Sequence, residues 1–498
     1  MQVEAPPRPA DTATAPLPAK VRDLADRAFA RASGALPVDG NAVRLLLDSR
    51  ENYPAWLAAI ESATDTVLFE MYILDDDRSG RRFADALAER ARAGVAVYVH
   101  VDWMGSRRAS RLFSDMRVAG VHVRIFNPPQ LSSPLGWVTR NHRKTIVVDG
   151  RVGFVSGLCI SDKWEGDPER QMEPWRDTGI EIRGPGVGEL VSAFAHAWQA
   201  SGEPLPPAAA SSEPAPEGDI RLRVIAGVPN ATGTYRLDLA IASIARKHLW
   251  LTDAYFVGTS AYVQALAAAA RDRVDVRLLV PGASDIPALT PLSRAGYRSL
   301  LEAGVRVYEW NGTMLHAKSA VADRMWSRVG STNLNLASWM GNYELDVAVE
   351  DADFAGRMAD QYEEDLKSAT EIVLTNRNRV RRSETATAGE VRVSRRAHAG
   401  SAGRAAAGAV SVGSALGAAL TNRRPLGPAE AGLLGYMSIA ALVLAALAAL
   451  WPALIAWPLA FLGAWVGIAW LAKAVALKNK AQKTRADETE PRAGGEKP

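Results

Sequence analysis

The sequence predicts an α/β protein of two similar lobes, followed by an apolar helical hairpin. Three observations predict it: a short polar motif occurs twice, the same order of strands and helices precedes each copy, and a long uncharged stretch lies near the carboxyl end. With 498 residues, 48% of them hydrophobic and 23% charged, the chain is long enough for two cores. The net charge of +3 is too small to indicate a partner.

The first 37 residues begin with a stretch rich in Pro and Ala that lacks the apolar centre of a secretory signal. We expect residues 1–37 to be disordered or loosely helical. The first lobe should occupy residues 38–200, where DTVLFEMYIL and VAVYVHVDW are typical of strands and SGRRFADALAERARAG is typical of a helix. FSDMRVAGVHVRIF then predicts a helix that leads into another strand.

The second lobe, over residues 219–376, repeats this order in HLWLTDAYFV, SAYVQALAAAARD, VDVRLLVPG, RAGYRSLLEAG and VRVYEW. Alternating strands and helices with short Gly-containing turns predict two α/β sandwiches with largely buried sheets. The Pro- and Ala-rich stretch 201–218 is the expected linker.

The duplicated motif is NHRKTIVVDG in the first lobe and LHAKSAVADR, 174 residues later, in the second. Each copy has a His, a Lys two residues on and an Asp five residues after the Lys. These residues are His142, Lys144 and Asp149, and His316, Lys318 and Asp323. The apolar runs IVVD and SAVAD predict buried strands, on which residues two apart share a face. Each His should therefore project with its Lys.

Two imidazoles and two ammonium groups that converge on one pocket suit a tetrahedral phosphate. Its transfer needs a nucleophile, a proton donor and positive charge. The alternative is that these are unrelated surface residues on edge strands.

The paired motifs resemble those of the phospholipase D superfamily, in which two H-x-K-x4-D motifs meet at one active site. The resemblance implies two lobes packed pseudo-symmetrically around that site and a covalent phosphohistidine mechanism without metal or cofactor. We expect His142 as the nucleophile and His316 as the general acid, although the near symmetry leaves the reverse assignment open. Lys144 and Lys318 should neutralise the non-bridging phosphate oxygens.

The second motif continues into Ser331 and Asn333, which the resemblance assigns to hydrogen bonds with phosphate. Asp149 and Asp323 are expected to brace their motifs rather than to touch substrate. At the offset of Asn333 the first lobe has Cys159, and a thiol is a poor substitute for an amide donor. The first half should thus bind phosphate less strongly.

Cys159 is the only cysteine, which excludes an intramolecular disulfide. Its apolar surroundings indicate a buried packing residue rather than a catalytic thiol.

A nucleophilic imidazole needs its second nitrogen held by an acceptor. Asp177 in WRDTGIEIRG and Glu344 in NYELDVAVED follow the two motifs at comparable distances, so they are the candidates for this orienting role. The alternative for each is a surface carboxylate at the start of a strand. The resemblance also points, with less weight, to Glu70.

RVDVRLLVPGASD, LLEAGVRVYEW, MLHAKSAVAD and GSTNLN are similar to the bacterial cardiolipin synthase branch of this superfamily. That branch implies formation of cardiolipin by transphosphatidylation from phosphatidylglycerol or a similar phospholipid. A phospholipase D or a phosphatidyltransferase with another acceptor alcohol is one alternative, and a membrane-tethered nuclease is another. No nucleic acid partner is expected, because the lobes lack an obvious basic and aromatic strip. The sequence does not indicate an oligomeric state.

The segment 377–430 is basic and rich in small residues, and between Arg377 and Arg424 it has ten arginines against only Glu384 and Glu390. Next to an apolar segment this favours anionic lipid headgroups, while nucleic acid binding and simple solvation remain alternatives.

The stretch Gly432–Ala472 has no charged residue, and as one helix it would reach roughly twice the hydrocarbon thickness of a bilayer. Pro452 and Pro458 near its middle predict a transmembrane hairpin over residues 431–474, followed by a charged tail over 475–498. Positive charge on both flanks predicts the bacterial inner membrane, with the lobes on the cytoplasmic side. A re-entrant hairpin is the alternative.

Overall fold

The computed structural model describes residues 19–129, 138–285, 289–374 and 380–382, together with scattered residues between 439 and 471. Most of the expected basic segment, most of the hairpin and the whole of the charged tail lie outside the described residues. Within the residues that are described, no helix is both long enough and apolar enough to cross a membrane.

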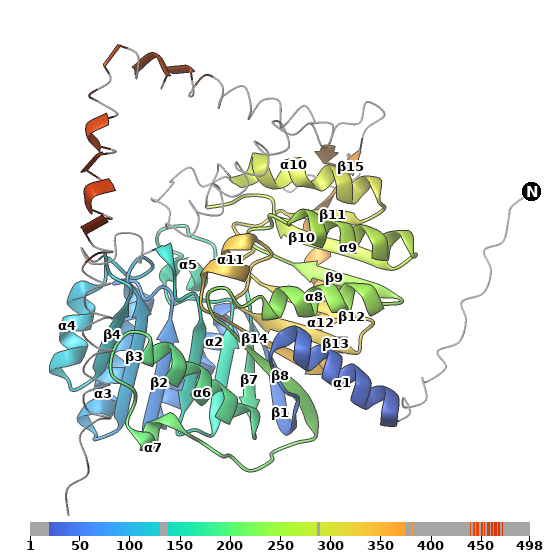
Figure 1. Cartoon of the computed structure of the whole chain (residues 1–498). Coiled ribbons are helices and arrows are strands. Elements are labelled where there is room, and N and C mark those ends of the chain that lie inside the picture. Colours follow the sequence, from blue (N-terminus) through green and yellow to red (C-terminus); the bar gives the residue numbers. More distant parts are fainter. Residues whose placement is uncertain are drawn as a thin grey trace, which may run out of the picture.

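One mixed sheet runs through both lobes in the described part of the chain (Figure 1). The first-lobe strands are β1 (Val38–Leu47), β2 (Thr66–Met71), β3 (Ala96–Asp102), β4 (His122–Phe126), β5 (Lys144–Val148), β6 (Val152–Ser156) and β7 (Thr178–Arg183). The second-lobe strands are β8 (Ile220–Gly227), β9 (His248–Thr252), β10 (Asp275–Pro281), β11 (Arg306–Trp310), β12 (Ser319–Ala322), β13 (Trp326–Gly330), β14 (Glu344–Glu350), β15 (Ala369–Leu374) and β16 (Val380–Arg382).

The lobes join where β1 and β8 pair antiparallel, with Val38 opposite Leu222 and Asn41 opposite Ile220. Outward from this junction the first lobe has the order β1-β7-β6-β5-β2-β3-β4, and the second has β8-β14-β13-β12-β9-β10-β11 before it continues into β15 and β16. The two orders match strand for strand. The predicted fold class, α/β with two pseudo-symmetric lobes, is confirmed by this topology.

Helices cover both faces of the sheet. They are α2 (Asp48–Glu61), α3 (Arg78–Arg92), α4 (Ser110–Val118), α5 (Asp162–Glu165), α6 (Gly186–Gln199), α8 (Gly233–Ile244), α9 (Ser260–Arg271), α10 (Leu289–Glu302), α11 (Leu336–Gly341) and α12 (Ala352–Lys367). One core packs α2, α3 and α4 on the first lobe, and another packs α8, α9 and α10 on the second. A third core joins α6 and α12, so it holds the two lobes together.

The expectation of disorder is wrong for part of the N-terminal segment, because Ala19–Ser33 forms helix α1 and packs beside α8. Asp26 of α1 contacts Arg223 on β8 at 2.7 Å, and this ion pair stabilises the helix against the sheet. The expected linker also contains structure, since α7 (Pro207–Ala210) buries Ala209 against the first lobe. Neither contact follows from local composition.

A buried ionic cluster lies in the second lobe beneath the sheet. The Arg328 guanidinium binds both carboxylate oxygens of Asp238 at 3.1 Å each and Asp346 at 2.9 Å. Even so, burial raises the pKa of Asp238 to about 6. The pseudo-equivalent positions in the first lobe, Phe154 and Gly179, carry no charge, so the cluster belongs to the second lobe alone.

We expect Arg328→Met to destabilise the protein by about 3–5 kcal/mol, because it leaves two buried carboxylates without a cation. The matched control is Arg324→Met, since Arg324 pairs with Asp360 at the surface, where such a pair contributes at most about 1 kcal/mol. Thermal unfolding of the full chain measures both. Equal losses for the two variants would contradict this account.

Candidate active site

The two motifs meet at the junction of the lobes through backbone hydrogen bonds. His142 N donates to Tyr343 O at 2.9 Å, and Tyr343 N donates to Arg140 O at 2.8 Å. In the same way His316 N donates to Arg176 O at 2.7 Å, and Arg176 N donates to Met314 O at 2.9 Å. Each motif histidine is therefore fixed by the opposite lobe.

This pairing corrects one detail of the prediction. Each histidine was expected on the motif strand, but β5 begins at Lys144 and β12 begins at Ser319. The histidines lie just ahead of these strands, because their backbone bonds cross to the other lobe.

Each imidazole also contacts a carboxylate from the opposite lobe. His142 Nδ1 lies 2.9 Å from Glu344 Oε2, and His316 Nδ1 lies 2.8 Å from Asp177 Oδ2. A carboxylate only accepts hydrogen bonds, so Nδ1 donates and the tautomer leaves the lone pair on Nε2. Of the two orienting candidates, Asp177 is thus placed against the second motif and Glu344 against the first.

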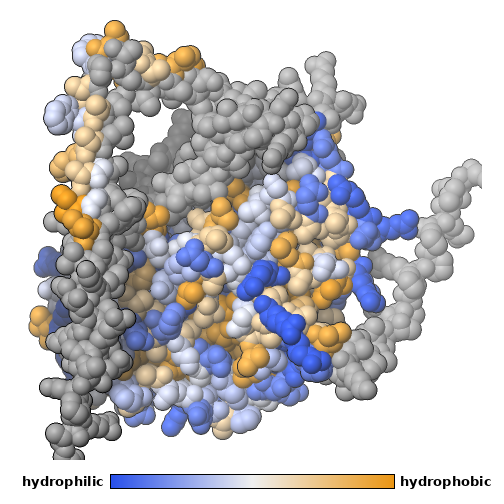
Figure 2. Space-filling model, viewed as in Figure 1, coloured by the Kyte–Doolittle hydropathy of each residue, from blue (hydrophilic) through white to orange (hydrophobic). Residues whose placement is uncertain are grey.

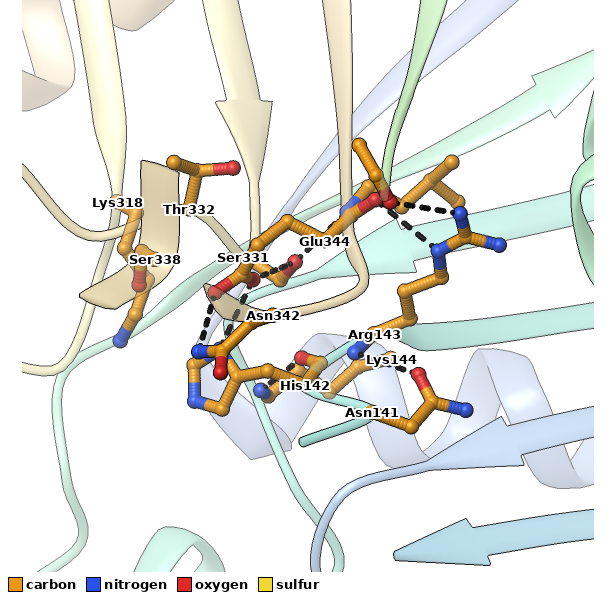
Figure 3. Close-up of polar contacts among 12 residues, drawn as sticks. Asn141, His142, Arg143, Lys144, Lys318, Ser331, Thr332, Ser338, Asn342 and Glu344 are labelled. Atoms are coloured by element: carbon orange, nitrogen blue, oxygen red, sulfur yellow. Dashed lines mark hydrogen bonds and ion pairs between the residues drawn. The ribbon is translucent and has the colours of Figure 1, made fainter. Parts of the chain in front are cut away.

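Both carboxylates are themselves held by donors. Glu344 accepts from Ser331 Oγ at 2.6 Å and from Asn342 Nδ2 at 3.2 Å (Figure 3). Asp177 accepts from Trp164 Nε1 at 3.0 Å and from the backbone of Thr178 at 2.8 Å.

Both carboxylates remain ionised, although burial favours their neutral form. Burial raises the pKa of Asp177, but His316 and Lys318 outweigh it, so that pKa stays below its ordinary value. The pKa of Glu344 is likewise raised by burial and lowered further by His142 and Lys144.

The structure corrects the expected role of Ser331. This side chain was assigned to phosphate, but its hydroxyl donates to Glu344 and accepts from Leu345 N at 2.9 Å. It is fully buried and does not line the pocket. Ser331 therefore positions the carboxylate that holds His142.

Trp164 has the corresponding place in the other half of the site, and sequence reasoning missed it. Its indole donates to Asp177, and its ring stands edge-on to His316 at 5.2 Å between centroids. Trp164 lies on the short helix α5, outside both motifs, and no periodicity or spacing distinguishes it. Only the fold brings its indole to Asp177.

The motif lysines are buried directly beneath the histidines. Lys144 Nζ donates to the carbonyl of His142, and Lys318 Nζ donates to the carbonyl of His316. Lys318 Nζ also lies 2.9 Å from Nδ1 and 3.1 Å from Nε2 of His316. Burial lowers the pKa of both ammonium groups. Their charge acts on the pocket from below rather than from its wall.

Asp149 and Asp323 lie at the far ends of their strands, away from the histidines. Asp149 accepts backbone hydrogen bonds from Thr64, Asp65 and Thr66 at 2.8–2.9 Å. Asp323 accepts them from Arg246, Lys247 and His248 at 2.7–3.0 Å. Each aspartate thus ties its motif to the loop before the neighbouring strand.

Glu70 is also close to the first motif but does not contact its histidine. It accepts from the Asn141 side chain at 2.7 Å.

His142 and His316 both line one pocket, which has about 660 Å³ of empty volume including its mouth. Asn333 lines it too, and its buried Oδ1 has no hydrogen-bond partner among the described residues. Cys159 lies in the wall, where burial raises the pKa of its thiol. The pocket therefore has an amide on the second-lobe side and a neutral thiol on the first-lobe side.

Burial keeps both imidazoles neutral. Burial lowers the pKa of His142 to about 4, although Glu344 opposes this. Burial and the adjacent Lys318 lower the pKa of His316 to about 3. A lowered histidine pKa means that the neutral form predominates at every pH above it, so both imidazoles are unprotonated at pH 7.

We expect NMR titration of imidazoles labelled with ¹⁵N to place both midpoints far below 6.5 in the free protein. Inorganic phosphate should raise both midpoints, because an anion in the pocket offsets the lysine charges that disfavour the imidazolium. Midpoints that stay near 6.5, with or without phosphate, would contradict the buried geometry.

Comparison with known proteins places this geometry in a family. A family model described as cardiolipin synthase, PLD-like domain, matches residues 56–164 and 239–366, one segment in each lobe. Cardiolipin synthase A of Pseudomonas aeruginosa (strain LESB58) is 33% identical over 359 residues, which cover 72% of this chain and 73% of that protein. Cardiolipin synthase A of Pseudomonas syringae pv. syringae (strain B728a) is 32% identical over 350 residues, covering 69% and 72%.

Among solved structures, phosphatidylserine synthase of Haemophilus influenzae Rd KW20 matches with a TM-score of 0.57 at 14% identity. The match covers 69% of this chain and 91% of that one, and it supports the fold. Two pseudo-symmetric lobes with paired His and Lys motifs define the phospholipase D superfamily. The chain belongs to its cardiolipin synthase branch.

Proposed function

We propose that this chain is a phosphatidyltransferase of the cardiolipin synthase type, which joins two phosphatidylglycerol molecules into cardiolipin and releases glycerol. The observation that carries the proposal is the crossed pairing of each histidine with a carboxylate of the other lobe, which brings both imidazoles to one pocket. The similarity to cardiolipin synthase A supports the choice of substrate class. No step needs a metal or cofactor.

In the first half-reaction His142 Nε2 attacks phosphorus, and the bond from phosphorus to the headgroup oxygen breaks. His316 protonates the departing glycerol. In the second, His316 takes the proton from a hydroxyl of another phosphatidylglycerol, that oxygen attacks phosphorus, and the bond from phosphorus to nitrogen breaks. The charges of Lys144 and Lys318 and the amide of Asn333 stabilise the phosphate oxygens in both transition states. Asp149 and Asp323 hold the motifs in place.

The surroundings of the two histidines support this assignment of roles. Lys318 Nζ lies 2.9 Å from Nδ1 and 3.1 Å from Nε2 of His316, so its positive charge acts on the whole ring and makes this imidazole the weaker nucleophile. Nε2 of His142 has no such donor within the described residues, and the ring reaches the pocket. A phosphate anion in the pocket offsets the lysine charge and raises the pKa of His316, which lets it carry the proton for the leaving group.

The proposal includes a division of the chain into domains and linking segments. Residues 38–200 and 219–376 are the two lobes, 201–218 links them, and 1–37 precede them. Residues 377–430 lead to a membrane hairpin over 431–474, and 475–498 form a charged tail. The apolar sequence supports the hairpin, and so do the exposed large side chains of Leu442, Trp457 and Phe461. Figure 2 shows orange, hydrophobic atoms along the described residues of this segment at the upper left.

The lobes then face the cytoplasm at the bacterial inner membrane. Thr421→Cys and Thr484→Cys test this, because both thiols should resist a membrane-impermeant reagent added outside intact cells. Labelling of either one would contradict the topology.

The function is tested by lipid analysis of a cardiolipin-deficient bacterial host that expresses the chain, beside His142→Ala and His316→Ala at matched levels. Cardiolipin should appear with the intact protein and with neither variant. Phosphatidic acid or another phosphatidyl alcohol in its place would assign a different acceptor. An unchanged lipid profile from folded protein would overturn the proposal.

A further inference from the structure

One carboxylate faces the pocket without serving a histidine. Among the described residues that line the pocket, Asp285 is the only acidic one, and it follows strand β10 of the second lobe. Asp177 and Glu344 lie behind the imidazoles and do not form the wall. The mechanism above gives Asp285 no role.

Asp285 is placed by Tyr255, whose phenol donates to Asp285 Oδ1 at 3.0 Å. Tyr255 stands edge-on to His316, with 5.8 Å between ring centroids, and Lys318 Nζ is 5.7 Å from the centroid of the same phenol ring. The pair therefore lies on the His316 side of the pocket. Tyr72 has the matching position beside His142, at 4.7 Å between centroids.

The charge of Asp285 is wrong for phosphate. The same wall contains Arg140 and Lys163, and the two motif lysines lie beneath it. A carboxylate at this place repels a phosphate anion, so it faces another part of the substrate. A carboxylate has about four acceptor positions, so it can accept from Tyr255 and from further donors at the same time. Its natural partners are hydroxyl or ammonium groups, and the surrounding cations disfavour ammonium.

The direction of attack places the alcohol on this side. If His142 attacks phosphorus, the leaving alcohol departs on the opposite side, and the acceptor enters by the same route. That side is occupied by the general acid, His316, and by the Tyr255 and Asp285 pair. A hydroxyl of the alcohol other than the reacting one can then reach the carboxylate.

We propose that Asp285, held by Tyr255, forms a polyol subsite that selects glycerol-type acceptors over alcohols with a single hydroxyl. The Asp285 carboxylate accepts a hydrogen bond from a hydroxyl that does not react. This inference rests on the proposed phosphatidyltransferase function and names the feature of the acceptor that the site recognises.

The test uses the purified full chain in mixed micelles of phosphatidylglycerol, with deuterated glycerol and ethanol in competition. Transfer to glycerol gives deuterated phosphatidylglycerol and transfer to ethanol gives phosphatidylethanol, so mass spectrometry yields their ratio. The intact chain should favour glycerol. Asp285→Asn should lower the ratio about tenfold, because it weakens a charge-assisted hydrogen bond made only by glycerol. Tyr255→Phe should lower it severalfold, because it removes the hydrogen bond from the phenol that helps to place Asp285.

Asp115→Asn is the matched control, since Asp115 is exposed on α4 and far from the pocket. Its ratio should equal that of the intact chain. If Asp285→Asn does not fold, Tyr255→Phe carries the test, because it retains the ring against His316.

An unchanged ratio in the folded variants would overturn the subsite while transfer itself upheld the proposed function. Absence of every transfer product from the intact chain would remove the function and the subsite together. Ethanolamine added as a third acceptor tests whether Asp285 binds an ammonium group rather than a hydroxyl. If it outcompetes glycerol, and Asp285→Asn reverses that preference, the subsite binds ammonium and the polyol assignment is wrong.

Discussion

His142→Ala is expected to abolish formation of the covalent intermediate with any donor, whereas His316→Ala should keep it when the leaving group needs no proton. Removal of the nucleophile should cost about 10⁴-fold or more in turnover. Removal of the general acid should cost about 10²–10⁴-fold with phosphatidylglycerol. A phosphatidyl ester of p-nitrophenol separates the two, because its leaving group departs as a stable anion.

The measurement is the burst of p-nitrophenol in a single turnover, followed by peptide mapping of the labelled histidine. His316→Ala should give a burst and a label on His142, and His142→Ala should give neither. His122→Ala is the control, since His122 is exposed on β4. A burst from His142→Ala, with the label on His316, would reverse the two roles.

The second large effect concerns the crossed carboxylates. Glu344→Gln and Asp177→Asn should each lower kcat by roughly 10²–10⁴-fold, because the amide neither stabilises the imidazolium nor fixes the tautomer. KM should change far less, since neither carboxylate lines the pocket. Glu189→Gln, exposed on α6, is the matched control.

The pairing of each histidine with a carboxylate of the other lobe leads to a sharper prediction. With the p-nitrophenol donor, Glu344→Gln should slow the burst, because Glu344 holds the nucleophile His142. Asp177→Asn should leave the burst rate close to that of the intact chain, because Asp177 holds the general acid. If Asp177→Asn slowed the burst and Glu344→Gln did not, the pairing of carboxylates with roles would be the reverse of the one proposed.

The duplicated motif and the repeated order of elements were enough to predict the fold class, because each depends on local pattern. The strands β2, β3, β9 and β10 and the helices α3 and α9 all lie where alternation and periodicity place them. The packing of helix α1 was missed because its stability comes from contacts with α8 and from Asp26 with Arg223, over 190 residues away in the chain.

The candidate site, like the fold, could be predicted from the sequence only in part. The positions of Asp177 and Glu344 relative to the motifs were enough to select these two carboxylates. The sequence did not predict that each carboxylate contacts the histidine of the other lobe. That crossing depends on the isolated backbone pairs between Asn141 and Tyr343 and between Arg176 and Leu315. Ser331 was misassigned for the same reason: its offset from the motif is the same whether it faces phosphate or Glu344. Only the packing of β13 against β14 decides between them.

The most direct test of cardiolipin synthesis gives the purified chain phosphatidylglycerol as its only lipid and follows the products by mass spectrometry. We expect cardiolipin and free glycerol in equal amounts, with no product when either motif histidine is replaced by Ala. Phosphatidic acid as the sole product, or cardiolipin formed by a variant that lacks one motif histidine, would contradict this expectation.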